Sequence, residues 1–204
     1  MWRRPQGPWP CSLTNIMLVR ARPPVDPAWR PDPTILLQPG LVKPLHGMNP
    51  RTIRGQQWWD GERRAAYRST GYRCLACAVT NVQLEAHEQY AIDFAACRYR
   101  YERAVPLCHR CHQYIHLGRC EMLVRQGQMP AEEFVEIQQH GDTILAAAHL
   151  SKDAHLMRLC GGDARLFFPE ETGTWARWHL RLDSRDYYSR FKDVDEWARH
   201  YAAT

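Results

Sequence analysis

Several features are missing from this sequence, and each absence excludes a class of protein. No apolar run reaches about 18 residues, so the sequence predicts no membrane-spanning helix. No internal repeat is present, which excludes a solenoid or propeller. The basic pair Arg3 and Arg4 precedes prolines and polar residues rather than an apolar stretch, so we expect no secretory signal. The remaining class is a globular protein whose 204 residues suit one core with appendages.

Lysine is also scarce, and the basic charge is unevenly distributed. Of the 27 basic residues 24 are arginine, a side chain suited to bidentate phosphate contacts, although arginine-rich codon usage explains this bias equally well. Residues 1–73 carry 12 basic and 4 acidic side chains, a net charge of +8. Residues 74–204 carry 15 and 18, a net charge of −3. The front of the chain therefore has the charge expected of a polyanion-binding surface.

Proline is concentrated at the front of the chain and almost absent elsewhere. Residues 1–50 hold 11 of the 14 prolines. Proline disfavours both helix interiors and central strands, so we expect an extended arm over residues 1–50. The segment Thr34–Val42 is apolar enough to dock on something, so we expect partial order there rather than a free tail.

The next segment has the spacing of a helix. Trp59, Arg63 and Tyr67 recur every four residues, which predicts a helix over 56–70 that ends before Gly71. Three arginines on this helix are candidates for contacting nucleic acid: Arg63, Arg64 and Arg68. A solvated helix face is the other interpretation of these charges.

The middle and end of the chain predict a hairpin, three helices, a second hairpin and a final helix. Residues 83–93 read as a strand with a partner near 98–105, followed by a short helix over 108–117. The stretch PAEEFVEIQQHG predicts an amphipathic helix that stops at Gly141, and DTILAAAHL predicts a second helix. The tail alternates, turns at 183–185 and closes with a helix from about Val194.

Four of the eight cysteines form two C-x-x-C pairs. Cys74 and Cys77 make the first pair, and Cys108 and Cys111 make the second, 30 residues later. Two such pairs can complete a tetrahedral zinc site of the closed, structural kind. A redox protein would have one pair beside a βαβ pattern, so a metal site in a reducing compartment fits better. The spacing identifies no partner for the remaining cysteines: Cys11, Cys97, Cys120 and Cys160.

Histidines surround the second cysteine pair. His112 and His116 are four residues apart on the predicted short helix, so both rings can face one point. The strand before them carries His87 and Glu88, which a zinc linking the two cysteine pairs would bring close to His112. Imidazole or carboxylate groups around a divalent cation are what phosphodiester hydrolysis requires. His109, inside the second pair, is not expected to be a ligand.

From Tyr67 to Gly118, a quarter of the chain, the pattern is C-x-x-C, then LEAHE, then PLCHRCHQYIH. This pattern resembles the zinc-knuckle branch of the HNH endonucleases, including divergent HNH-like proteins of phages and bacteria. The resemblance implies an α+β protein with a zinc-stapled ββα-metal core over 51–120. The arm over 1–50 precedes this core, and a helical pair followed by a small β-hairpin and helix makes up 121–204.

The family's functional positions can be carried over residue by residue. His112 takes the place of the final His of the motif, His116 that of a supporting imidazole, and His87 that of the usual metal ligand. Two positions depart from the family: Glu88 stands where the family has the water-activating His, and Arg103 stands at the central Asn. Glu88 then serves as the base; alternatively, His87 is the base and Glu88 or Asp93 binds the metal.

Two functions follow from this resemblance. The first is a metal-dependent DNA endonuclease of the cytoplasm of a bacterium or phage-infected cell, with a structural Zn²⁺ and a catalytic Mg²⁺ or other divalent cation. His87, Glu88 and His112 would be its catalytic residues, with His112 and His116 holding the cation. The second is a non-catalytic zinc module that binds nucleic acid or protein, which the two departures favour.

Overall fold

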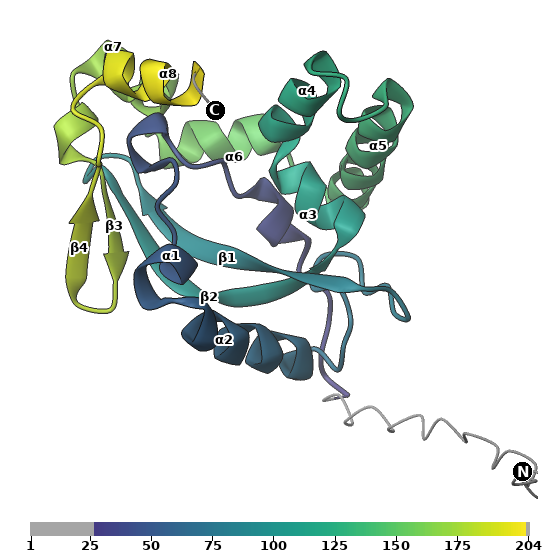
Figure 1. The fold of residues 1–204 in the computed structure, drawn as a ribbon. Helices are drawn as coiled ribbons and strands as arrows, with labels where there is room; N and C mark the ends of the chain where they lie inside the picture. Colours follow the sequence, from purple (N-terminus) through teal and green to yellow (C-terminus); the bar gives the residue numbers. More distant parts are fainter. Residues whose placement is uncertain (1–26, 203–204) are drawn as a thin grey trace, which may run out of the picture.

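The computed structural model describes residues 27–202, and its strands form one mixed sheet in the order β1-β2-β3-β4 (Figure 1). The long antiparallel hairpin of β1 and β2 dominates this sheet, with a register shift between Gln89 and Tyr90. A second, short hairpin extends it, because β3 pairs in parallel with the start of β2. The strand bounds are Leu84–Asp93 (β1), Arg98–Cys108 (β2), His179–Leu182 (β3) and Arg185–Tyr188 (β4).

Eight α-helices and four 3-10 helices surround this sheet within the described residues. Among them, none is long and apolar enough to cross a lipid bilayer. The α-helices are α1 (Pro50–Arg54), α2 (Gln56–Ser69), α3 (His109–Ile115), α4 (Leu117–Arg125), α5 (Ala131–Ala147), α6 (Lys152–Leu159), α7 (Pro169–Thr172) and α8 (Val194–Ala202). The 3-10 helices are η1 (Pro33–Leu37), η2 (Lys43–Leu45), η3 (Ala164–Phe167) and η4 (Trp175–Arg177).

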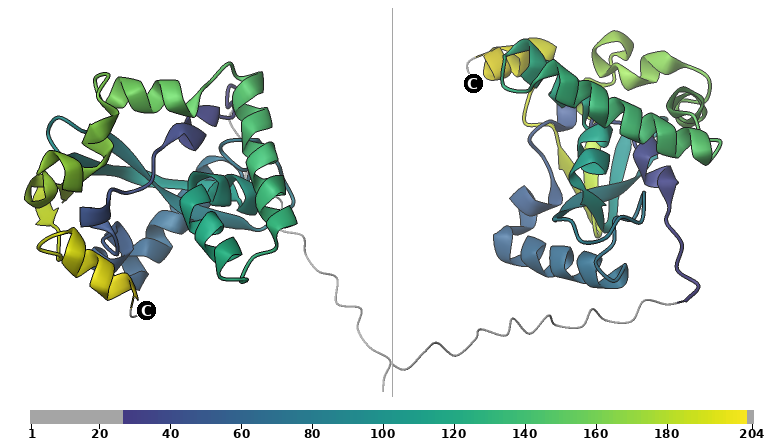
Figure 2. Two further views of the ribbon diagram at one scale, coloured as in Figure 1. Left: turned by 90° about the horizontal axis from the view of Figure 1, so that it is seen from above. Right: turned by 90° about the vertical axis from the view of Figure 1, so that its right-hand side faces the viewer.

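The β1–β2 hairpin separates two helical layers (Figures 1 and 2). Helix α2 covers one face, where Ala104 of β2 packs with Trp59 and Ala66. Helix α3, the arm and α5 cover the other face, where Val105 packs with residues of all three. Because side chains alternate along a strand, neighbouring residues of β1 point into different layers.

The proline-rich arm is docked rather than free over its described part. Residues Ile35, Leu36 and Leu37 are buried against α3 and α5, and the Tyr99 hydroxyl donates to the Gly40 carbonyl at 2.9 Å. The prediction that the segment Thr34–Val42 is partly ordered rather than a free tail is therefore confirmed. Residues 1–26 of the predicted arm lie outside the described residues.

One helix replaces two that the sequence predicts. Helix α5 continues through Gly141, so the predicted stop there and the separate second helix are wrong. A Cβ at position 141 would lie 2.1 Å from the Tyr114 ring. The glycine is therefore explained by close packing of the Tyr114 ring of α3 against α5, not by helix termination.

The C-terminal hairpin joins the main sheet through a second apolar cluster. Trp178, which precedes β3, is fully buried with Phe94 and Tyr99 of the first hairpin, and this packing holds β3 beside β2. The predicted turn at 183–185 is present, with Asp183 in the left-handed conformation, and α8 begins at Val194 as predicted.

Candidate metal centres

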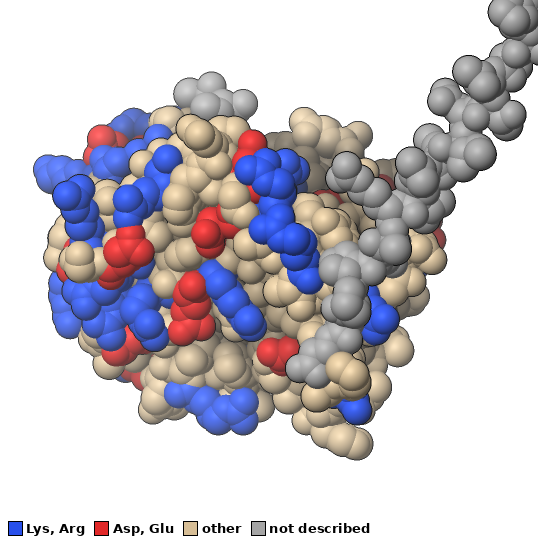
Figure 3. Space-filling view, turned by 90° about the horizontal axis from the view of Figure 1, so that it is seen from below, with Lys and Arg blue, Asp and Glu red and all other residues tan. Residues whose placement is uncertain are grey.

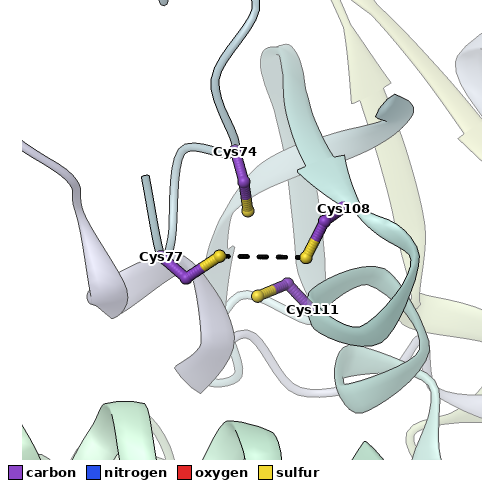
Figure 4. Close-up of side chains that lie close together, drawn as sticks. All are labelled: Cys74, Cys77, Cys108 and Cys111. Carbon is purple, nitrogen blue, oxygen red and sulfur yellow. Dashed lines mark hydrogen bonds between the residues drawn. The ribbon is translucent and has the colours of Figure 1, made fainter. Parts of the chain in front are cut away.

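Four cysteines from two separate stretches of the chain converge at one end of the hairpin (Figure 4). Cys74 and Cys77 lie in a tight turn after α2, in which the Ala78 N–H donates to the Cys74 carbonyl at 2.9 Å. Cys108 is the last residue of β2, and Cys111 lies in the first turn of α3. The Leu75 N–H donates to the Pro106 carbonyl at 2.8 Å, which ties the turn to β2.

The geometry of the four sulfurs suits a tetrahedral metal ion. All four lie within 4.8 Å of one another, and Cys77 Sγ is 3.8 Å from Cys108 Sγ. A tetrahedron with zinc–sulfur bonds of about 2.3 Å has edges of about 3.8 Å. Hydrogen bonding, chiefly from Cys111, lowers the pKa of Cys108. The tetracysteine cluster therefore fits a metal such as zinc.

Three histidines converge at a second point. His87 of β1 faces α3, and its ring centroid lies 5.3 Å from that of His112 and 5.0 Å from that of His116. One nitrogen of each ring lies within 4.8 Å of the others. Burial, followed by the neighbouring imidazoles, lowers the pKa of His87 well below its usual value and that of His116 to about 4. Both rings are therefore neutral at neutral pH, the form that binds metal ions.

A carboxylate that the sequence analysis missed supports this triad. Glu85 contacts Nδ1 of His112 and lies 2.8 Å from Nδ1 of His109. Burial opposes its ionisation, but the hydrogen bonds with His109 and His112 outweigh this effect and lower the pKa of Glu85. The contact leaves Nε2 of His112 available for a cation. Strand alternation could have found Glu85, since it lies two residues before His87 on the same face.

The arm covers His87 through Gln38. The Gln38 Oε1 accepts from the Tyr90 N–H at 2.9 Å, and its Nε2 donates to the Glu88 carbonyl at 3.0 Å. These two bonds fix the amide, so Nε2 also donates to Nε2 of His87 at 3.0 Å. Nδ1 of His87 is buried and has no partner within the described part of the chain. Nδ1 is therefore the nitrogen of the His87 ring that makes no hydrogen bond within the described residues.

Glu88, predicted at the same site, lies on the opposite face of the hairpin. It pairs across the strands with Ala104, which packs under α2. Burial raises its pKa, an effect that Arg51 of α1 partly offsets. Arg103, where the resemblance leads one to expect an Asn, donates to the Gln89 side chain at 2.8 Å. Neither residue belongs to the metal-binding groups of residues 27–202.

The three arginines of α2 are exposed but lie away from the histidines. Arg63, Arg64 and Arg68 are on the helix that covers the Glu88 face, whereas the histidines lie under the arm and α3. Basic side chains gather on this underside of the molecule, most densely toward the β3–β4 hairpin (Figure 3). The sequence placed these arginines on one helix, but it did not show that the sheet separates them from the histidines.

Comparison with known proteins adds no assignment to these two centres. The chain matches no protein-family model, no curated protein and no solved structure.

Proposed function

We propose that this protein is a metal-dependent endonuclease of the HNH type that hydrolyses phosphodiester bonds in DNA. The observation that carries the proposal is the convergence of His87, His112 and His116 beside the tetracysteine cluster, on a hairpin followed directly by a helix. The tetracysteine metal would be structural zinc, because four thiolates leave no open coordination position.

The histidine triad would hold the exchangeable cation. Three imidazoles with an open fourth position suit Zn²⁺ or another transition-metal ion better than Mg²⁺, which prefers oxygen ligands. Such a cation polarises a phosphoryl oxygen and lowers the pKa of a bound water. Glu85 would orient His112 through Nδ1, and the buried Nδ1 of His87 would gain the partner that it lacks among the described residues.

A non-catalytic zinc module is the second candidate, and two observations favour it. Glu88 faces α2, so the carboxylate that the resemblance puts at the family's base does not lie beside the histidines. Gln38 also donates to Nε2 of His87, which places the ring's proton on Nδ1. A cation at Nδ1 would require that proton to leave and Gln38 to turn. In this interpretation the arm seals the triad and only the nucleic-acid or protein contacts are functional.

Plasmid nicking distinguishes these candidates. We expect purified protein to nick supercoiled DNA with Mn²⁺ or Zn²⁺, more weakly with Mg²⁺, and not after removal of the exchangeable cation. His112→Ala should reduce nicking to the level without cation while zinc content stays unchanged, because His112 is not one of the four thiolate ligands. His155→Ala, a matched change on α6, should keep full activity. Equal nicking by parent and His112→Ala would contradict the nuclease proposal, and no nicking with any cation would favour the binding module.

Binding to DNA is expected to involve the arginines of α2 and to weaken steeply with salt. Each phosphate contact contributes a slope of about −0.9 in log affinity against log salt concentration, so reversing all three charges should flatten the slope by about 2 to 3. The measurement is fluorescence anisotropy on a labelled duplex at several salt concentrations, with Arg63, Arg64 and Arg68 changed to Glu. The matched control reverses three exposed arginines on other elements: Arg125, Arg158 and Arg165. Equal losses in both triple variants would contradict a specific role for α2.

A further inference from the structure

Helix α5 is fixed against α3 by a short run of residues that the site described above does not include. The Tyr114 ring of α3 packs where Gly141 has no side chain, and the Tyr114 hydroxyl donates to Asp142 Oδ1 at 2.6 Å. Lys152 donates to the Tyr114 carbonyl at 3.0 Å and lies 3.8 Å from the centre of its ring. The packing at Gly141 and the hydrogen bond to Asp142 hold this part of α5 against the helix that carries Cys111, while Lys152 ties α6 to the same tyrosine.

The residue before Gly141 reaches the tetracysteine cluster. Nε2 of His140 lies 3.3 Å from Sγ of Cys111. A metal-bound thiolate has no proton to donate, so at this distance the imidazole bonds to it only by donating an N–H from Nε2. Cys111 is itself fully buried, so water is a poor substitute for this contact. An N–H directed at a buried sulfur is a donor suited to a thiolate.

The negative charge of the metal centre explains why a hydrogen bond to Cys111 would stabilise it. Four thiolates around one divalent cation carry an excess of negative charge, which is costly to bury unless nearby donors offset it. Groups that hydrogen-bond to metal ligands from outside the ligand set orient those ligands and tune the metal. Helix α5 lies far from both cysteine pairs in the sequence, so this donor reaches the centre only through tertiary packing.

We infer that His140 is a positioning residue for the tetracysteine metal: its N–H donates to Cys111 Sγ, orients that ligand and stabilises the metal–thiolate centre. The inference depends on a metal at the four cysteines and not on nuclease activity.

Two variants of similar size separate hydrogen bonding from packing. His140→Gln keeps an N–H near the position of Nε2, whereas His140→Leu fills the space without a donor. We expect His140→Leu to lower zinc affinity by about tenfold or more in competition with a chromophoric chelator, and His140→Gln to retain most of it. His155→Leu, on α6, is the matched control and should bind zinc like the parent.

A spectroscopic measurement makes the result independent of folding stability. In the Co²⁺-substituted protein, loss of a donor to sulfur should shift the thiolate-to-metal charge-transfer band of His140→Leu but leave His140→Gln close to the parent. Unchanged zinc affinity and an unchanged band in His140→Leu would overturn the inference. Equal losses in both variants would also overturn it, because they would assign His140 a packing role alone.

Discussion

Removal of the tetracysteine metal is expected to unfold the protein. Structural zinc contributes on the order of 10 kcal/mol in small sites, which is comparable with the whole stability of a domain. Cys108→Ser should therefore bind no zinc tightly and lose the cooperative melting transition seen by circular dichroism, and a strong chelator should do the same to the parent. Metal analysis of the parent should find one zinc per chain at this site.

The expected loss is large because the cysteines are part of the main apolar core. Cys74, Cys108 and Cys111 pack in the same buried cluster as Leu36 of the arm and Ile137 of α5. If the two cysteine pairs separate, the packing of this cluster is lost with them, because no covalent cross-link joins the cysteine pairs, the arm and α5 to one another. Cys120→Ser is the control, since Cys120 is equally buried but lies outside the four-sulfur cluster. An unchanged melting temperature in Cys108→Ser would contradict a structural metal.

The parts of this structure that the sequence predicts are those that short-range patterns encode. The spacing of Trp59 and Tyr67 predicts α2, and the paired C-x-x-C motifs predict the four-sulfur cluster, because each pattern lies within a few residues or has a known ligand geometry. The predicted pair of helices over 130–150 is wrong because Gly141 is as typical of a helix end as of a close helix contact. Only the position of the Tyr114 ring distinguishes the two.

Long-range partners are the part that the sequence does not predict. Gln38 bonds to His87 from 49 residues away, and His140 reaches Cys111 from 29 residues away. The parallel pairing of β3 with β2 is unpredictable for the same reason, because it depends on how Trp178 packs against the first hairpin. None of these partners carries a spacing signal, so each depends on the assembled tertiary structure.

A change from glutamate to glutamine is expected to affect cation binding and nicking differently at two positions of β1. Glu88→Gln should leave cation affinity and nicking near the parent level, because this side chain faces α2. Burial raises the pKa of Glu88, so its charge costs stability once the pH exceeds the ordinary pKa of a glutamate. The variant should therefore melt at a higher temperature than the parent at neutral pH, and this difference should disappear as the pH falls below that ordinary value.

Glu85→Gln should have a far larger effect on the histidine triad. Its carboxylate contacts Nδ1 of His112 and so fixes which nitrogen of that ring is free for a cation. Loss of such a partner typically costs 10- to 100-fold in metal affinity or activity, so we expect losses of about that size in Mn²⁺ binding and in nicking. Isothermal titration of the zinc-loaded protein with Mn²⁺ measures the first, and plasmid nicking measures the second. If Glu88→Gln lost activity while Glu85→Gln kept it, the base would lie on the α2 face, and the cation site at the histidines would be contradicted.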